Sequence, residues 1–248
     1  MIRRKETIAV WFSCGAASAV AAKKTIEQYE TAYNILIVNN PIKEEHEDNR
    51  RFLKEVEEWL QYPITIAKNN NFPNASIVEV FNKYKYIGNI YGSLCTSFLK
   101  KEARYQFELK NKIDWHVLGF TIDEYIRQKN FNTRERENTL PVLISNLITK
   151  ADCFKILQKA NIKLPEIYSL GFPNANCIGC VKATSPSYWN LVRNTFPLIF
   201  KERAEQSRQI GAKLVRVNGK RIYLDELKIT DKGNKIKSWE CGIFCDTK

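Results

Sequence analysis

The chain has 248 residues, of which 44% are hydrophobic and 27% charged, a composition typical of a globular protein with a sizeable core. No apolar run approaches the roughly 20 residues of a membrane-spanning helix, so we expect no membrane partner. The formal net charge of +12 favours a polyanionic partner, nucleic acid or a charged nucleotide, although a solvated basic surface would explain the same excess.

The first half of the chain alternates predicted strands with predicted helices. Apolar β-rich segments stand at 7–13, 34–40, 63–67 and 114–120. Segments of helical composition or spacing stand at 17–29, 44–60, 76–87 and 97–112. This alternation predicts an α/β fold, a parallel sheet sandwiched by helices in a Rossmann-like arrangement.

From about Asn132 the pattern becomes irregular. We expect a helix near 146–161, Pro- and Gly-containing connections, and a hairpin over 214–227 that turns at Asn218-Gly219. The predicted organisation is therefore an α/β core over 1–131 and an irregular, cysteine-bearing part over 132–248, packed on the core as one domain.

The N-terminus carries basic and then apolar residues, as a secretory signal does. Ser13, Cys14 and Gly15 interrupt the apolar run, and the segment continues as strand, loop and helix, so we expect a cytoplasmic protein. In that compartment CxxC spacing, as in Cys177 and Cys180, more often indicates metal or redox chemistry than a disulfide framework. The seven cysteines also include Cys153, which stands in a helical segment and is expected to be buried.

Small residues connect the first predicted strand to the first predicted helix. The loop reads SCGAAS, from Ser13 to Ser18, and leaves free backbone N–H groups at a helix N-terminus. These donors and the helix dipole favour an anion such as phosphate or sulfate, although tight packing alone also uses small residues.

This segment resembles the PP-loop of the adenine-nucleotide α-hydrolase-like superfamily, SGGxDS. Ser13, Gly15 and Ser18 match the motif, whereas Cys14 replaces a glycine and Ala17 replaces the aspartate. The resemblance implies a nucleotide site that includes Ser13, Cys14, Gly15, Ala16 and Ser18.

Downstream motifs resemble the phosphoadenylyl-sulfate (PAPS) and adenylyl-sulfate (APS) reductase family, in its bacterial or phage form. The similar stretches are LGFTIDEYIRQKNF, LPEIYSLGFPNANCIGC, YGSLCTSFLKK and WECGIF, and they follow the family's order. The resemblance implies that Lys100, or the neighbouring Lys101, and Arg127 bind the nucleotide's anionic groups. It also implies a [4Fe-4S] cluster on Cys95, Cys177 and Cys180.

The fourth position of that cluster is open in this reading, or is filled by Cys245, Cys14 or a non-protein ligand. A zinc site on Cys177, Cys180, Cys241 and Cys245 is the alternative, because zinc takes four such ligands. Three protein cysteines with one open iron would resemble the sulfur-inserting RNA thiolases of the same superfamily.

The C-terminal WECGIF resembles the reductase family's ECGLH, which implies that Cys241 attacks the sulfate sulfur of PAPS or APS. A thiol reductant such as thioredoxin then releases sulfite from the S-sulfonate. Two alternatives remain open: a sulfur transferase that thiolates RNA or DNA with ATP, and a non-catalytic nucleic-acid-binding module.

Overall fold

A computed structural model describes residues 4–89 and 92–233 of the chain. Its main sheet has four strands, β1 (Thr7–Phe12), β2 (Asn34–Asn39), β3 (Ile64–Ile66) and β6 (Trp115–Val117). The strands run in the order β3-β2-β1-β6, and all three pairings are parallel. Two short hairpins complete the strands: β4 (Gly88–Asn89) with β5 (Gly92–Ser93), and β7 (Val215–Val217) with β8 (Lys220–Ile222).

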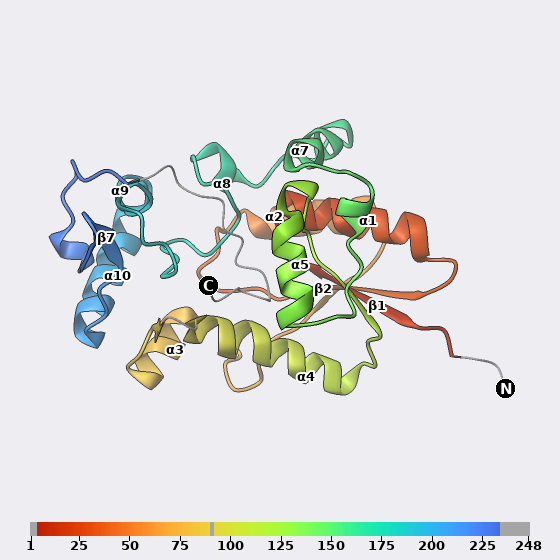
Figure 1. Cartoon of the computed structure of the whole chain (residues 1–248), viewed down its shortest axis with the longest axis horizontal. Helices are drawn as coiled ribbons and strands as arrows, with labels where there is room; N and C mark the ends of the chain where they lie inside the picture. The colour runs from red at the N-terminus through yellow and green to blue at the C-terminus, as the bar shows by residue number, and fades with distance from the viewer. Residues whose placement is uncertain (1–3, 90–91, 234–248) are drawn as a thin grey trace.

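Helices cover both faces of the main sheet and build the part of the molecule farthest from it (Figure 1). The helices that follow the first three strands are α1 (Ala16–Tyr29), α2 (Asn49–Leu60) and α3 (Ile77–Tyr84). Before and after β6 lie the π-helical turn η1 (Thr96–Lys101), α4 (Glu102–Lys110), η2 (Ile122–Glu124) and α5 (Tyr125–Arg134). The remainder comprises α6 (Val142–Ser145), α7 (Lys150–Lys159), α8 (Glu166–Ser169), α9 (Pro186–Thr195), α10 (Pro197–Ile210) and η3 (Leu224–Glu226).

The alternation of side chains along β1 explains the sandwich. Ile8, Val10 and Phe12 pack into one core cluster with residues of α1, α2 and α7. Ala9 and Trp11 point to the opposite face and join a cluster that includes residues of α4 and α5. A strand buried on both faces reads as a continuous apolar run, as β1 does.

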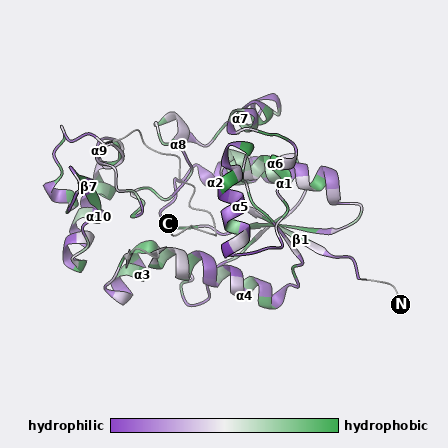
Figure 2. Cartoon of the chain, in the orientation of Figure 1, coloured by the Kyte–Doolittle hydropathy of each residue, from purple (hydrophilic) through white to green (hydrophobic). Residues whose placement is uncertain are grey.

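A separate core cluster lies beyond the edge of the sheet. It joins α3 to the segment 172–183 and to α9, α10 and the β7–β8 hairpin. Figure 2 shows hydrophobic and hydrophilic residues interleaved along α3, whose Ile77, Val80 and Phe81 are buried in this cluster. The CxxC segment is therefore held in a packed interior rather than in a surface loop.

The expected α/β sandwich is confirmed, and so is the hairpin that turns at Asn218-Gly219. Three expectations were wrong in detail. The helix expected over 44–60 begins only at Asn49, because Glu44 folds away to cap α3, accepting hydrogen bonds from Ser76 Oγ and from the Ile77 N–H. The region after Asn132 is also more regular than expected, since α9 and α10 lie within it.

The helix expected near 146–161 is shorter than expected. It begins at Lys150, because Thr149 and Asp152 form a capping box there. In the described residues, no helix has the length and apolar character that a membrane span requires.

Candidate functional site: a nucleotide loop beside a cysteine pocket

The strand order creates a topological switch point beside β1. The chain passes from β1 through α1 to β2 on one side, whereas β6 joins β1 from the other side. In open α/β sheets, ligands bind in the crevice outside the carboxyl ends of strands arranged in this way. The loop after β1, residues 13–18, and the segment after β6 therefore border the expected ligand position.

The loop after β1 turns sharply into α1. Cys14 adopts a left-handed φ of 55°, and Gly15 precedes the helix in an extended conformation without a side-chain cap. Ser18 folds back: its Oγ donates to Gly15 O at 2.9 Å and accepts from the Ser13 N–H at 3.1 Å. The loop thus holds its own shape, and the N-terminus of α1 has no side-chain cap.

Tyr168 reaches over this helix N-terminus. Its hydroxyl accepts a long hydrogen bond, 3.4 Å, from the Ala16 N–H. The N–H groups at this end of α1 are therefore presented to a polar oxygen, as they would be to an oxygen of an anion.

Gly119, directly after β6, lies against the backbone of the loop. A Cβ at this position would come within 2.7 Å of Ser18 N and 3.0 Å of Ala17 C. Glycine is therefore required here for close packing between the β6 end and the start of α1.

Two asparagines fix the carboxyl end of β2. Asn39 Nδ2 donates to Phe12 O at 2.8 Å and contacts Cys14 Sγ at 3.4 Å. Asn40 Nδ2 donates to Ala67 O and to Leu99 O, both at 2.9 Å. The first asparagine supports the loop after β1, and the second anchors η1 to the edge of the sheet.

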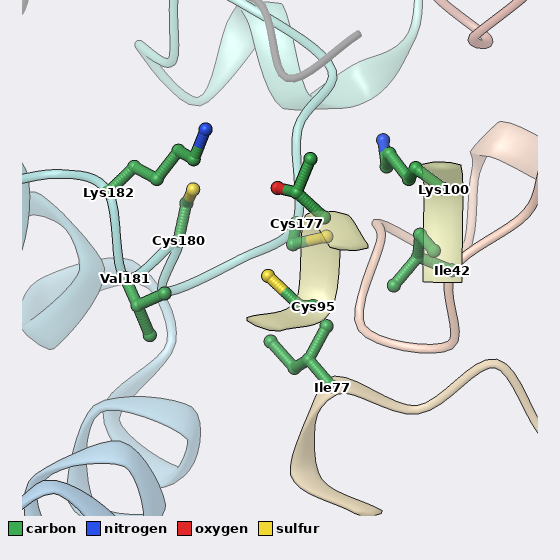
Figure 3. A pocket seen from close by; sticks show the side chains of 9 residues that line it. Ile42, Ile77, Cys95, Lys100, Cys177, Cys180, Val181 and Lys182 are labelled. Atoms are coloured by element: carbon green, nitrogen blue, oxygen red, sulfur yellow. The ribbon is translucent and has the colours of Figure 1, made fainter. Parts of the chain in front are cut away.

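A pocket beyond this edge brings three cysteines together (Figure 3). Cys95 precedes η1, whereas Cys177 and Cys180 come from the CxxC segment more than 80 residues later. The pocket encloses about 340 Å³ between its atoms, including solvent at its mouth. The remaining lining residues are Ile42, Ile77, Thr96, Lys100, Val181 and Lys182. In Figure 3 the ammonium groups of Lys100 and Lys182 lie at the end of the pocket opposite Ile77.

Buried hydrogen bonds hold the CxxC segment in place. The Ile178 N–H donates to Glu44 O at 2.9 Å, and the Cys180 N–H donates to the Tyr188 hydroxyl at 2.8 Å. Gly179 has a φ of +68°, so the turn between the cysteines takes a conformation that favours glycine. Burial, reinforced by Cys180, raises the pKa of Tyr188 well above its usual value, so its hydroxyl stays a neutral partner.

The pocket has the chemistry of a site for a thiolate-bound group. Thr96 Oγ1 is buried, and it has no hydrogen-bond partner among the described residues. A buried hydroxyl left unpaired is costly, so an occupant with acceptor atoms would satisfy it. Thiolates favour zinc or iron–sulfur clusters over hard cations.

A zinc ion and an iron–sulfur cluster make different demands on the positions of the thiols. Zinc holds each thiolate at about 2.3 Å from one centre. Throughout residues 4–89 and 92–233, no three His, Cys, Asp or Glu side chains are grouped closely enough to hold one metal ion. In a cluster each iron takes a different cysteine, so the thiols can surround a larger space.

Lys100 lines the cysteine pocket and also acts electrostatically on Cys14 of the loop after β1. Its Nζ lies 3.9 Å from Glu45 Oε1, and both side chains are buried. Burial raises the pKa of Glu45 to about 7, and Lys100 opposes this shift. Burial, together with Glu45, raises the pKa of the Cys14 thiol far above its usual value, while Asn39 and Lys100 oppose it. Cys14 is therefore a neutral thiol near pH 7, and it does not line the cysteine pocket.

Other predicted residues lie in distinct settings. Arg127 pairs with Glu124 at 2.5 Å and lies 5.1 Å above the Phe120 ring, in the segment that follows β6. Lys101 points away from the pocket and pairs with Glu135 at 2.9 Å, so Lys100 is the lysine of this pair that reaches the site. Cys153 is buried in the core, as expected. The predicted nucleophile Cys241, and Cys245, lie outside the described residues.

Sequence reasoning missed several polar residues of the site, namely Asn39, Asn40, Thr96 and Tyr168. The two asparagines carried a usable signal, because polar residues that end an apolar strand mark the carboxyl edge of a parallel sheet. Thr96 and Tyr168 carried no comparable signal, since their roles depend on contacts between distant segments. The acidic segment 44–48, which includes Glu45, stood out after the second strand, but the sequence assigned no role to any one of its residues.

No family model matches the chain, and neither does the sequence of any curated protein. Among solved structures, the chain is similar to the U34-tRNA thiolase NcsA from Methanococcus maripaludis with its [4Fe-4S] cluster. The identity is 12%, the TM-score is 0.50, and the match covers 98% of this chain and 81% of that chain. This likeness confirms the expected Rossmann-like α/β fold. It does not single out the PAPS/APS reductases, so that assignment stays a prediction.

Proposed function

We propose that the protein is an iron–sulfur enzyme that transfers sulfur to a nucleic-acid base activated by ATP. The observation that carries the proposal is the cysteine pocket beside the loop after β1, with Lys100 and Glu45 between them. In this proposal the nucleotide's phosphates bind at the N-terminus of α1. Cys95, Cys177 and Cys180 hold a [4Fe-4S] cluster.

The chemistry requires a nucleotide and a sulfur source at one place. A base carbonyl oxygen attacks the α-phosphorus of ATP and releases pyrophosphate; sulfide then displaces AMP, so that C=O becomes C=S without net oxidation. The N–H groups of α1 bind the phosphates, and Lys100 balances negative charge between the two regions. When bound, the cluster supplies an iron that can hold sulfide.

Charge and fold both support a nucleic-acid substrate. The net charge of +12 suits a polyanion. A tRNA thiolase with a [4Fe-4S] cluster has the same fold. Because Ala17 replaces the PP-loop aspartate, any carboxylate for magnesium must come from elsewhere, and Glu45 is the acidic residue whose charge acts on the loop.

Sulfonucleotide reduction is the second candidate, favoured by the C-terminal sequence ECGIF. In that reaction the Cys241 thiolate would attack the sulfate sulfur of APS or PAPS, breaking the S–O bond and expelling the nucleoside phosphate. Two reductant thiols, from thioredoxin for example, would then release sulfite and become a disulfide.

One set of assays separates the candidates. Anaerobically purified protein is incubated with ATP, sulfide and either tRNA or DNA, and the nucleic acid is digested and analysed by mass spectrometry. We expect a sulfur-for-oxygen nucleoside that depends on ATP and disappears in Cys177→Ala. Cys153→Ala, a cysteine outside the pocket, serves as the control.

A parallel incubation uses APS or PAPS without reductant. A sulfonate on Cys241, with no thiolated nucleoside in the first assay, would replace the transferase proposal by the reductase. If neither product forms, both activities are rejected.

A further inference from the structure

Helix α10 buries an arginine near the cysteine pocket. Arg203 is only 3% exposed. Its guanidinium donates to Gln206 Oε1 and lies 5.8 Å from the centroid of the Phe81 ring. Within the described part of the chain, its Nε has no hydrogen-bond partner.

A buried guanidinium needs a counter-charge, because it stays protonated and loses its hydration. Burial lowers the pKa of Arg203, and the groups that oppose this shift are Glu44 and the three cysteines of the pocket. The Glu44 carboxylate is already engaged, since it accepts from Ser76 Oγ at 2.6 Å and from the Ile77 N–H at 2.9 Å. The three pocket thiols are the other acidic groups that act on Arg203.

Packing connects α10, the helix that carries Arg203, to α3 and to the core cluster of Cys177 and Cys180. Gln206 Nε2 joins α10 to α3 through Asn82 Oδ1 at 3.0 Å. On α3, Phe81 stands one turn after Ile77, which lines the cysteine pocket (Figure 3). Cys177 and Cys180 belong to the same core cluster as the α10 residues beside Arg203.

We propose that Arg203 is the buried counter-charge of the three pocket thiolates, a positioning residue that stabilises their metal-bound form. The inference rests on the cluster proposed above. A cluster bound by three thiolates keeps a net negative charge, and a fixed cation inside the core offsets it where water cannot. Reduction adds further negative charge, so Arg203 also favours the reduced cluster.

The test compares Arg203→Gln with Arg203→Lys in anaerobically purified, iron-loaded protein. We expect the glutamine variant to lose iron to a ferrous chelator roughly tenfold faster than the parent, the low end of effects seen for groups that support metal ligands. Its reduction midpoint should shift to more negative potential. The lysine variant keeps the charge and should lose iron within roughly threefold of the parent rate.

Arg208→Gln is the control on the same helix, because Arg208 is exposed and pairs with Asp225 at 2.7 Å. Circular dichroism of each variant verifies folding. If the lysine and glutamine variants lose iron equally fast, packing rather than charge is responsible and the inference is overturned. If the parent holds iron and the glutamine variant matches it in both iron loss and midpoint potential, only the inference about Arg203 is overturned. If the parent holds no iron, the proposed cluster is overturned as well.

Discussion

Gly119→Ala tests whether the start of α1 is the anion site. The added Cβ would lie 2.7 Å from Ser18 N and 3.0 Å from both Ala17 C and Ser18 Cα. Carbon atoms pack comfortably at about 3.5–4.0 Å, so the two backbones must move apart by roughly 0.5–1 Å. Overpacking of this kind costs roughly 1–3 kcal/mol of stability. If these backbone atoms bind the anion, nucleotide affinity should fall by roughly tenfold, about the loss of one hydrogen bond to a charged group.

Calorimetry with ATP measures the affinity, and thermal denaturation measures the stability. Gly211→Ala is the matched control: its φ of +77° disfavours alanine, but no atom lies within 4 Å of the added Cβ. Both variants should lose stability, whereas only Gly119→Ala should lose affinity. A Gly119→Ala variant that binds ATP as the parent does would refute the assignment of this loop as the anion site.

Three further predictions concern the cluster, Arg127 and Glu45. Cys177→Ala should abolish the brown colour and the roughly four irons per chain expected by iron analysis of the parent, while Cys153→Ala retains both. Arg127→Ala should weaken ATP binding by roughly 1.5–3 kcal/mol in calorimetry, and an unchanged affinity would mean that Arg127 serves only Glu124 and Phe120. Because the pKa of Glu45 is raised from 4.5 to about 7, its contribution to stability is full below pH 4.5 and is lost as the pH rises to 7. Urea denaturation at pH 5 and pH 7 should show a loss of roughly 2–3 kcal/mol that Glu45→Gln removes; equal slopes in both proteins would contradict this.

The sheet could be predicted because each strand carries its own signal. Its strands are short apolar runs separated by helices, and β1 is buried over its whole length. Helices α9 and α10 were missed for a local reason: each has proline in its first turn, where proline is favourable, yet a proline also reads as a break. The helix start at Asn49 was missed for a tertiary reason, since Glu44 caps α3 rather than its own helix.

The site could be predicted only in part. The cysteines and Lys100 were named through motif resemblance, and the structure brings them to one pocket. Spacing alone could not have joined Cys95 to Cys177, which are 82 residues apart. Arg203 had no signal at all, because an arginine in a helix is ordinarily a surface residue and its burial depends on the packing of α10 against α3.

The position of Lys100 gives the two halves of the site a physical connection. Asn40 fixes η1 to the sheet by donating to Leu99 O at 2.9 Å. Lys100, the next residue, therefore extends from an anchored turn. Its charge lowers the pKa of Glu45 and of Cys14, which lies in the loop after β1. Its side chain also lines the cysteine pocket. An anion bound on either side therefore interacts with the same buried cation. Sulfur transfer to an activated base needs the nucleotide and the sulfur source to be adjacent, and Lys100 reaches both regions.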